Sequence, residues 1–205
     1  MIDFYTADSS NGQRVAIMLE ECGLPYKLVK LDLMGGEQRK PEFLKVNPAG
    51  AIPAIVDPDG PGGKPLSLAQ SAAIVLYLAE KTQHFLPQDP ARRAEALQWL
   101  MQATTDTAAS SLGIFLLSTF APEKSDANVA FFEERVLRYF RVADRRLADR
   151  PYLAQELSVA DFALYPLAVV RRPLIERAGD LPHLTRWAAD LAARPGVERG
   201  MNAAK

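Results

Sequence analysis

The sequence predicts a fold in two parts, an α/β unit followed by an all-helical unit. Strand and helix signals alternate over residues 1–81, a segment with two prolines follows at 82–90, and from residue 91 onward the apolar residues recur at helical spacing alone. We therefore expect an α/β domain at 1–81, a linker at 82–90 and an all-helical domain at 91–205.

The α/β unit opens with a strand–helix–strand pattern. Residues 2–5 and 26–31 predict strands, and the helix expected between them at 12–22 carries Val15, Leu19 and Cys22 on one face. Because a crossover of this kind joins strands that run in one direction, the two strands should be parallel. The remaining elements expected are a short helix after Pro41, strands at 52–56 and 65–68, and a helix at 70–81, which gives the order β-α-β-α-β-β-α.

The second unit contains only helix signals. Helices are expected at 91–119, 129–147, 159–171 and 181–193, the third with a bend at Pro166. Ser158 and Asp161 form a capping-box pattern, in which the serine caps the helix start and the carboxylate returns to the cap residue. This pattern predicts that a helix begins at Val159.

Composition excludes several classes of partner. Lys and Arg number 24 and Asp and Glu 25, for a net charge of −1, so no overall field attracts nucleic acid or an anionic membrane. No segment approaches the roughly 20 apolar residues that span a bilayer, and the N-terminus lacks a secretory signal pattern. A single cysteine rules out an internal disulfide, and His84 and His183 lack partners at metal-ligand spacing. We expect a cytoplasmic protein without a metal.

Two segments predict a peptide-binding site. Pro53 precedes a short β-branched run and cannot donate to a sheet ladder, so it should begin a strand, with a cis bond between Ile52 and Pro53. The N–H and C=O of Ile52 would then be available to pair with an extended peptide. Gln70 and Ser71 open a helix whose N-terminal N–H groups and dipole suit a carboxylate. Together these features suit a small acidic peptide.

Three motifs occur in an order that resembles the cytosolic glutathione transferase family over the whole chain. They are Asn47-Pro48 with Ile52-Pro53-Ala54-Ile55, Gln70-Ser71 with the apolar helix that follows, and the Ser158 to Asp161 capping box. The resemblance implies a thioredoxin-like N-terminal domain and an enzyme that activates glutathione as thiolate. Residues 2–12, with Gln38 and 41–44, are most similar to the bacterial Nu class and to glutathione-dependent disulfide-bond oxidoreductases. Glutathione would then be the cosubstrate, and a small electrophile or a disulfide the second substrate.

Ser9 and Asn11 are the residues that the resemblance assigns to the sulfur. A free thiol with a pKa of about 8.5 is mostly protonated at pH 7, and a hydroxyl donor favours the thiolate. Ser9 would supply that donor and Asn11 would assist. From the residues alone, 8–11 can equally be a loop and helix cap, with Asn11 as the N-cap, and Ser10 is the alternative sulfur donor.

The rest of the tripeptide is assigned by the same resemblance. The residues implied are Gln38 and Lys40 at the glycine end, Ile52 and Pro53 at the cysteinyl backbone, and Gln70 and Ser71 at the γ-glutamyl end. An alternative for the last pair is that both residues cap their helix and nothing more. Cys22 is interpreted as a small core residue on an apolar helix face rather than as a redox group.

The second unit carries the implied subunit contacts. The family arrangement implies a homodimer in which Asp106 reaches the γ-glutamyl amine bound by the neighbouring subunit, and in which Trp99, Met101 and residues 108–111 face the symmetry mate. Phe131 stands where relatives that bind two glutathiones carry an arginine. The alternative function is a non-catalytic binding or regulatory protein on the same scaffold.

Overall fold

The computed structural model describes residues 1–205 and divides them into two compact units. Unit 1 combines residues 1–84 with 193–205, and unit 2 is formed by residues 85–192. Unit 2 is therefore shorter than the helical domain expected at 91–205. The difference arises because the last residues of the chain form a helix that packs on the first helix of unit 1.

Unit 1 has the predicted β-α-β-α-β-β-α order, with one further helix from the end of the chain. Its elements are β1 (Ile2–Thr6), α1 (Ser10–Glu21), β2 (Tyr26–Lys30), η1 (Glu37–Arg39), α2 (Pro41–Leu44), β3 (Ala54–Asp57), η2 (Pro61–Gly63), β4 (Leu66–Ala69), α3 (Ser71–Thr82) and α10 (Pro195–Asn202). Helix α1 begins at Ser10 rather than at Gly12. Strand β3 begins at Ala54, so Pro53 lies directly before the strand rather than in it.

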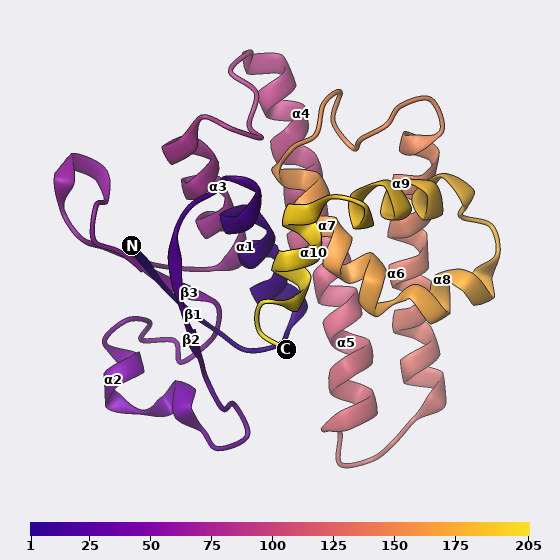
Figure 1. Cartoon of the computed structure of the whole chain (residues 1–205). Coiled ribbons are helices and arrows are strands. Elements are labelled where there is room, and N and C mark those ends of the chain that lie inside the picture. Colours follow the sequence, from indigo (N-terminus) through magenta and orange to yellow (C-terminus); the bar gives the residue numbers. More distant parts are fainter. The chain divides into compact units, whose positions relative to one another are not determined.

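The four strands of unit 1 form one sheet in the order β2-β1-β3-β4. β1 and β2 pair in parallel, as predicted, and β3 pairs antiparallel with both β1 and β4. Side chains alternate across the sheet: Phe4 is fully buried, whereas Tyr5 contacts Phe43 of α2 with ring centroids 5.7 Å apart. Helices α1 and α3 pack against each other, and α2 lies on the other side of the sheet (Figure 1).

The C-terminal helix α10 packs on α1 (Figure 1). A Cβ built at Gly200 would stand 2.5 Å from the Cα of Ile17, so only glycine allows the two backbones to come this close. Two ion pairs flank the contact, Arg194 with Glu21 and Arg199 with Glu20, each with an N–O distance of 2.6 Å. The end of the chain thereby becomes part of the core of unit 1.

Unit 2 is entirely helical, as predicted. Its elements are α4 (Pro90–Met101), a π-helical turn η3 (Gln102–Thr107), α5 (Ala108–Thr119), α6 (Asp126–Leu147), α7 (Val159–Val170), α8 (Arg172–Ala178) and α9 (Pro182–Ala192). The helix predicted at 91–119 is continuous apart from η3, and α5 and α6 lie side by side (Figure 1). α6 begins at Asp126 rather than at 129, because Ser125 Oγ caps it by accepting from the N–H of Asn128 at 3.2 Å. The short helix α8 was not predicted.

The predicted capping box is present at the start of α7. Ser158 Oγ accepts from the N–H of Ala160, and Asp161 Oδ2 accepts from the N–H of Ser158 at 3.0 Å. Asp161 is fully buried, and this burial raises the pKa of its carboxyl to about 6, against the opposing effect of its hydrogen bonds. The capping box is therefore also a buried titratable site.

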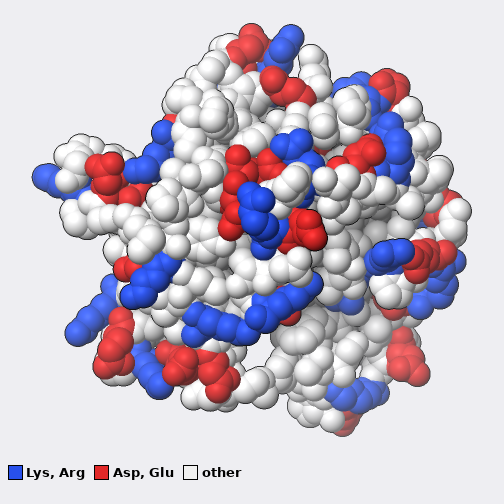
Figure 2. All heavy atoms as spheres, viewed as in Figure 1, with Lys and Arg blue, Asp and Glu red and all other residues white.

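The surface carries charges of both signs. On the face seen in Figure 2, Lys and Arg side chains alternate with Asp and Glu side chains. Exposed ion pairs such as Arg172 with Glu176, 2.7 Å apart on α8, illustrate the pattern. No helix combines the length and the apolar character needed to cross a membrane.

Candidate functional site

The N-terminus of α1 carries Ser9, Ser10 and Asn11. Ser9 is the N-cap: its backbone is extended, and its Oγ accepts a hydrogen bond from the N–H of Gly12 at 3.1 Å. Because this bond uses only a lone pair, the hydroxyl hydrogen can still donate to a ligand. Ser10 is the first helical residue, and Asn11 is an exposed residue of the first turn. The interpretation of Asn11 as the N-cap is therefore wrong.

The peptide bond between Ile52 and Pro53 is cis, as predicted. The sheet ladder of β3 starts at Ala54, so the backbone of Ile52 lies beyond the paired part of the strand. Asn47 holds the preceding loop, since its Nδ2 donates to the carbonyl of Ala51 at 2.6 Å. The backbone N–H and C=O of Ile52 therefore lie outside the sheet ladder, as the predicted pairing with an extended ligand requires.

Gln70 and Ser71 form a strained turn at the start of α3. Gln70 has a φ of 71° and a ψ of 113°, a backbone conformation that residues with a Cβ rarely adopt. Such strain, of order 1–3 kcal/mol, is concentrated at ligand-binding sites. Gln70 occupies the N-cap position, yet its exposed side chain makes no capping hydrogen bond. The interpretation of its side chain as a helix cap is therefore wrong.

Arg14, which the sequence analysis did not single out, connects the two helix starts. Its side chain is 1% exposed, and its Nη1 donates to Asn11 Oδ1 at 2.5 Å and to Ser71 Oγ at 3.3 Å. The spacing of three residues from Asn11 was visible in the sequence, but Ser71 lies on another element. The predicted sulfur-side and γ-glutamyl-side residues are thus brought together by one buried guanidinium.

Gln38 and Lys40 lie at η1 and directly after it. The side-chain Nε2 of Gln38 donates to the backbone carbonyl of Leu33 at 3.2 Å. The backbone carbonyl oxygen of Gln38 lies 3.1 Å from the position of a Cβ built at Gly50. Gln38 is therefore next to the loop that leads to Ile52. The exposed Lys40 pairs with Glu37 at 2.8 Å, and this hydrogen bond raises the pKa of the Lys40 ammonium.

Asp106 belongs to unit 2 and lies in the π-helical turn η3. The hydroxyl of Tyr139 donates to Asp106 Oδ1 at 3.4 Å, and the guanidinium groups of Arg135 and Arg138 lie 5.8 Å and 5.1 Å from the centre of the Tyr139 ring. Phe131, earlier on the same helix as Tyr139, is 63% exposed. Asp106 therefore forms part of a polar cluster within its own unit.

The predicted subunit-facing surface needs a correction. Trp99, Ser110 and Ser111 are buried within unit 2, so they cannot face a symmetry mate. Met101 and Ala109 are exposed, as the prediction requires. The helical period explains the error, because residues 108–111 cover a full turn and only part of a turn points outward.

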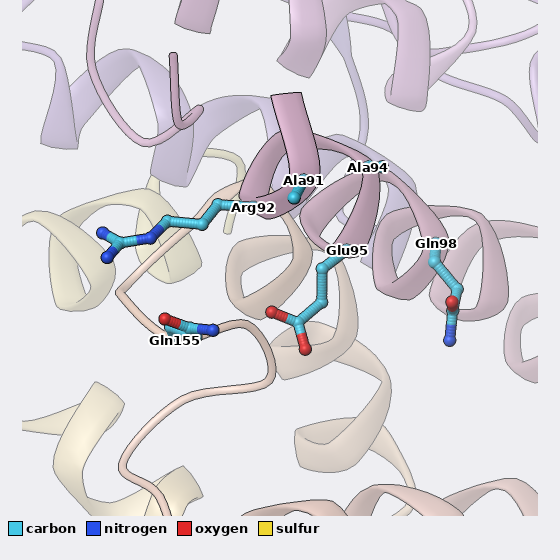
Figure 3. A pocket seen from close by; sticks show the side chains of 6 residues that line it. All are labelled: Ala91, Arg92, Ala94, Glu95, Gln98 and Gln155. Carbon is cyan, nitrogen blue, oxygen red and sulfur yellow. The ribbon is translucent and has the colours of Figure 1, made fainter. Parts of the chain in front are cut away.

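A hollow of about 480 Å³ lies elsewhere, on α4 of unit 2 (Figure 3). Its polar lining consists of Arg92, Glu95, Gln98 and Gln155, with Ala91 and Ala94 between them. Glu95 forms an ion pair with Arg146, whose guanidinium lies 5.7 Å from the centre of the Trp99 ring. None of the predicted site residues lines this hollow. No group of three or more His, Cys, Asp or Glu side chains in the chain is arranged to hold a metal ion.

The fold and the site define a class of protein, a thioredoxin-like domain with a helical partner domain and a glutathione motif. Models of the N-terminal and C-terminal domains of glutathione S-transferases match residues 8–81 and 107–195. The chain belongs to the glutathione S-transferase family.

Two of the proteins to which the chain is similar are disulfide-bond oxidoreductases of Escherichia coli. The disulfide-bond oxidoreductase YfcG of Escherichia coli is 37% identical over 98% of this chain and 94% of its own length. The disulfide-bond oxidoreductase YghU of the same organism is 33% identical over 97% of this chain and 73% of its own length.

Solved structures extend the comparison to bound ligands. A glutathione transferase from Pseudomonas putida, with one glutathione disulfide bound per subunit, superimposes with a TM-score of 0.90 at 36% identity, over 98% of this chain and 90% of that one. A glutathione transferase from Burkholderia graminis, with two glutathione molecules per subunit, gives a TM-score of 0.92 at 35% identity, over 100% of this chain and 88% of that one.

Proposed function

We propose that the protein binds glutathione on unit 1 and uses its thiolate in thiol–disulfide exchange. The observation that carries the proposal is the meeting of two helix N-termini, those of α1 and α3, on the buried guanidinium of Arg14. Two helix starts and a buried cation favour a ligand with negative charges at two points. Glutathione ionised at its sulfur and at its γ-glutamyl carboxylate is such a ligand.

Four of the predicted residues, Ser9, Ile52, Gln70 and Gln38, have a definite role in this proposal. The Ser9 hydroxyl donates to the sulfur and holds it as thiolate, because a hydrogen bond to the charged form lowers the thiol pKa. Ile52 pairs with the cysteinyl backbone, and the exposed amide of Gln70 accepts from the γ-glutamyl amine. Gln38 lies at the glycine end, whereas the ion pair of Lys40 with Glu37 makes Lys40 a weaker candidate there.

The proposed reaction proceeds by attack of the bound thiolate on one sulfur of a disulfide. A new sulfur–sulfur bond forms to glutathione, the old one breaks, and the second sulfur leaves as a thiolate that takes a proton from water. The names of the E. coli relatives, both disulfide-bond oxidoreductases, and the glutathione disulfide bound by the P. putida protein support exchange over other uses of the thiolate.

A second candidate is transfer of glutathione to an electrophilic carbon, with a carbon–sulfur bond formed and a leaving group released. The observation that favours it is an apolar surface on unit 2, where Phe115, Phe120 and Phe131 are 49%, 56% and 63% exposed. Exposed aromatic side chains in this number suit an apolar second substrate better than a polar disulfide.

We further propose a homodimer. The outer face of α4 and α5 exposes Met101, Leu112 and Leu116, at 42%, 53% and 46% of their surface. An apolar helix face of this kind is suited to a two-fold interface. Light scattering on a size-exclusion column should give twice the mass of one chain, and a monomer at micromolar concentration would contradict the proposal.

Calorimetric titration with reduced and then oxidised glutathione tests the main proposal. We expect both to bind, and we expect the protein to reduce a mixed disulfide of glutathione with a small thiol. Binding of reduced glutathione alone, with conjugation of an aryl halide, would favour the second candidate. Binding of neither would overturn both and favour the non-catalytic alternative.

A further inference from the structure

Arg14 is the most completely buried cation of unit 1, in the first half of α1. Only 1% of the residue is exposed, and burial lowers the pKa of its guanidinium to about 10. The side chain is therefore still positively charged at pH 7. A buried charge needs specific polar contacts to offset the loss of its hydration.

The contact with Arg14 fixes the orientation of the Asn11 amide. An amide side chain has an acceptor end and a donor end, and a guanidinium can only donate. Arg14 Nη1 donates to Asn11 Oδ1 at 2.5 Å, so the acceptor end of Asn11 faces the protein. The NH₂ end must then point away from Arg14, and Asn11 is exposed to the solvent side.

The same guanidinium also donates a hydrogen bond to Ser71. Its Nη1 donates to Ser71 Oγ at 3.3 Å, which uses a lone pair of the hydroxyl and leaves the hydroxyl hydrogen for another acceptor. Ser71 is the first residue of α3, where the unpaired backbone N–H groups also favour an anion. Both partners of Arg14 are therefore turned into donors that face away from it.

We propose that Arg14 is a positioning residue that orients Asn11 and Ser71 as hydrogen-bond donors toward the thiolate and the γ-glutamyl carboxylate of glutathione. The inference rests on the proposed function, because it takes glutathione as the ligand. The nearby anionic group on the same segment, Asp8, is exposed and accepts from Gln13 Nε2 at 3.1 Å, so it is engaged away from Asn11.

A purely structural role is the competing explanation, in which Arg14 only joins α1 to α3. That role predicts lower stability for a variant but an unchanged thiol pKa once the variant is folded. Orientation of donors predicts a change in the ionisation of the bound thiol itself. The absorbance of the glutathione thiolate in the ultraviolet, followed against pH in the complex, separates the two.

The variants are Arg14→Gln, Arg14→Lys and, as a matched control, Val15→Ala. Val15 is buried in the same helix, so its truncation weakens the packing of α1 without changing a charge. In Arg14→Gln we expect the pKa of the bound thiol to rise by roughly one unit or more and the affinity for glutathione to fall about tenfold. Arg14→Lys should recover part of both effects, and Val15→Ala should change neither.

Asn11→Asp keeps the test decisive if Arg14→Gln does not fold. An aspartate preserves an acceptor for Arg14, removes the NH₂ donor and adds a negative charge beside the thiolate, so the thiol pKa should rise in a protein of undiminished stability. Wild-type thiol pKa values in Arg14→Gln and Asn11→Asp would overturn the inference. Failure of the unsubstituted protein to bind glutathione would instead overturn the proposed function.

Discussion

The indole N–H of Trp187 donates to Asp161 Oδ1 at 2.9 Å and so ties α9 to the start of α7. The same oxygen accepts from the N–H of Leu153 at 3.0 Å, and the other carboxylate oxygen accepts from Ser158. One buried carboxylate thus completes the capping box, accepts a hydrogen bond from the loop before it and joins α7 to α9. The folding of unit 2 should therefore depend on its ionisation.

Asp161 gives unit 2 a pH-dependent stability. Burial raises the pKa of this carboxyl to about 6 in the folded protein, above its unfolded value of about 3.9. The stability that it contributes is therefore fully present below pH 4 and is lost as the pH rises through 6. Urea unfolding at pH 4 and pH 7 should show the advantage of the wild-type protein over Asp161→Asn shrinking by about 2 kcal/mol.

Trp187→Phe provides the control for this prediction. It removes one donor to the carboxylate, so the folded pKa of Asp161 should rise further and the loss of stability should move to higher pH. An advantage over Asp161→Asn that grows between pH 4 and pH 7 would show instead that the hydrogen bonds outweigh burial.

Ser9→Ala should have two separable effects. Loss of the N-cap bond to Gly12 should lower the free energy of unfolding by about 1 kcal/mol. Loss of the hydroxyl donor should raise the pKa of the thiol of bound glutathione by roughly one unit. Ser9→Thr should restore both. Ser10→Ala is the matched control, and a larger change in thiol pKa there would assign the sulfur to Ser10.

Gln70→Gly should stabilise the folded protein and weaken its binding of glutathione. Glycine tolerates the φ of 71°, so we expect the free energy of unfolding to rise by about 1 kcal/mol. The missing amide should weaken glutathione binding about tenfold, as for a hydrogen bond to a charged amine. Gln83→Gly, at a φ of 58° after α3, should show the stabilisation alone. Equal affinities in both variants would remove Gln70 from the site.

Gly200→Ala should destabilise unit 1. The added Cβ would meet the backbone of Ile17 at 2.5 Å, and neither α1 nor α10 can yield without losing contacts. We expect a loss of about 1–3 kcal/mol in chemical unfolding, and almost none for Glu198→Ala on the exposed side of the same helix. Equal stabilities of the two variants would show that α10 adjusts freely.

Local patterns were sufficient to predict most elements of the fold. The strand–helix–strand opening, the cis bond before Pro53 and the capping box at Ser158 each depend on neighbouring residues, and the structure has all three. The helix α10 was not predicted because Arg194-Pro195-Gly196 is a typical end signal. Proline instead begins α10 at its first position, where it needs no N–H donor.

The candidate site was predicted from the resemblance and from helix starts, but its central cation was not. Arg14 lies among apolar residues of α1, and an arginine there is also compatible with a side chain that reaches solvent. Its burial becomes evident only when α3 packs beside α1 and brings Ser71 next to it. Contacts between distant elements of this kind have no local signature.

The position of α10 in unit 1 also sets the order in which the chain can mature during synthesis. Unit 1 cannot complete its core until residues 193–205 have been synthesised, which is after all of the residues of unit 2, 85–192. Each new molecule must therefore carry an incomplete unit 1 until residues 193–205 have left the ribosome. A premature stop before residue 193 would leave the Gly200 contact and both arginine–glutamate pairs unmade, and such a product would be left for chaperones and proteases to remove.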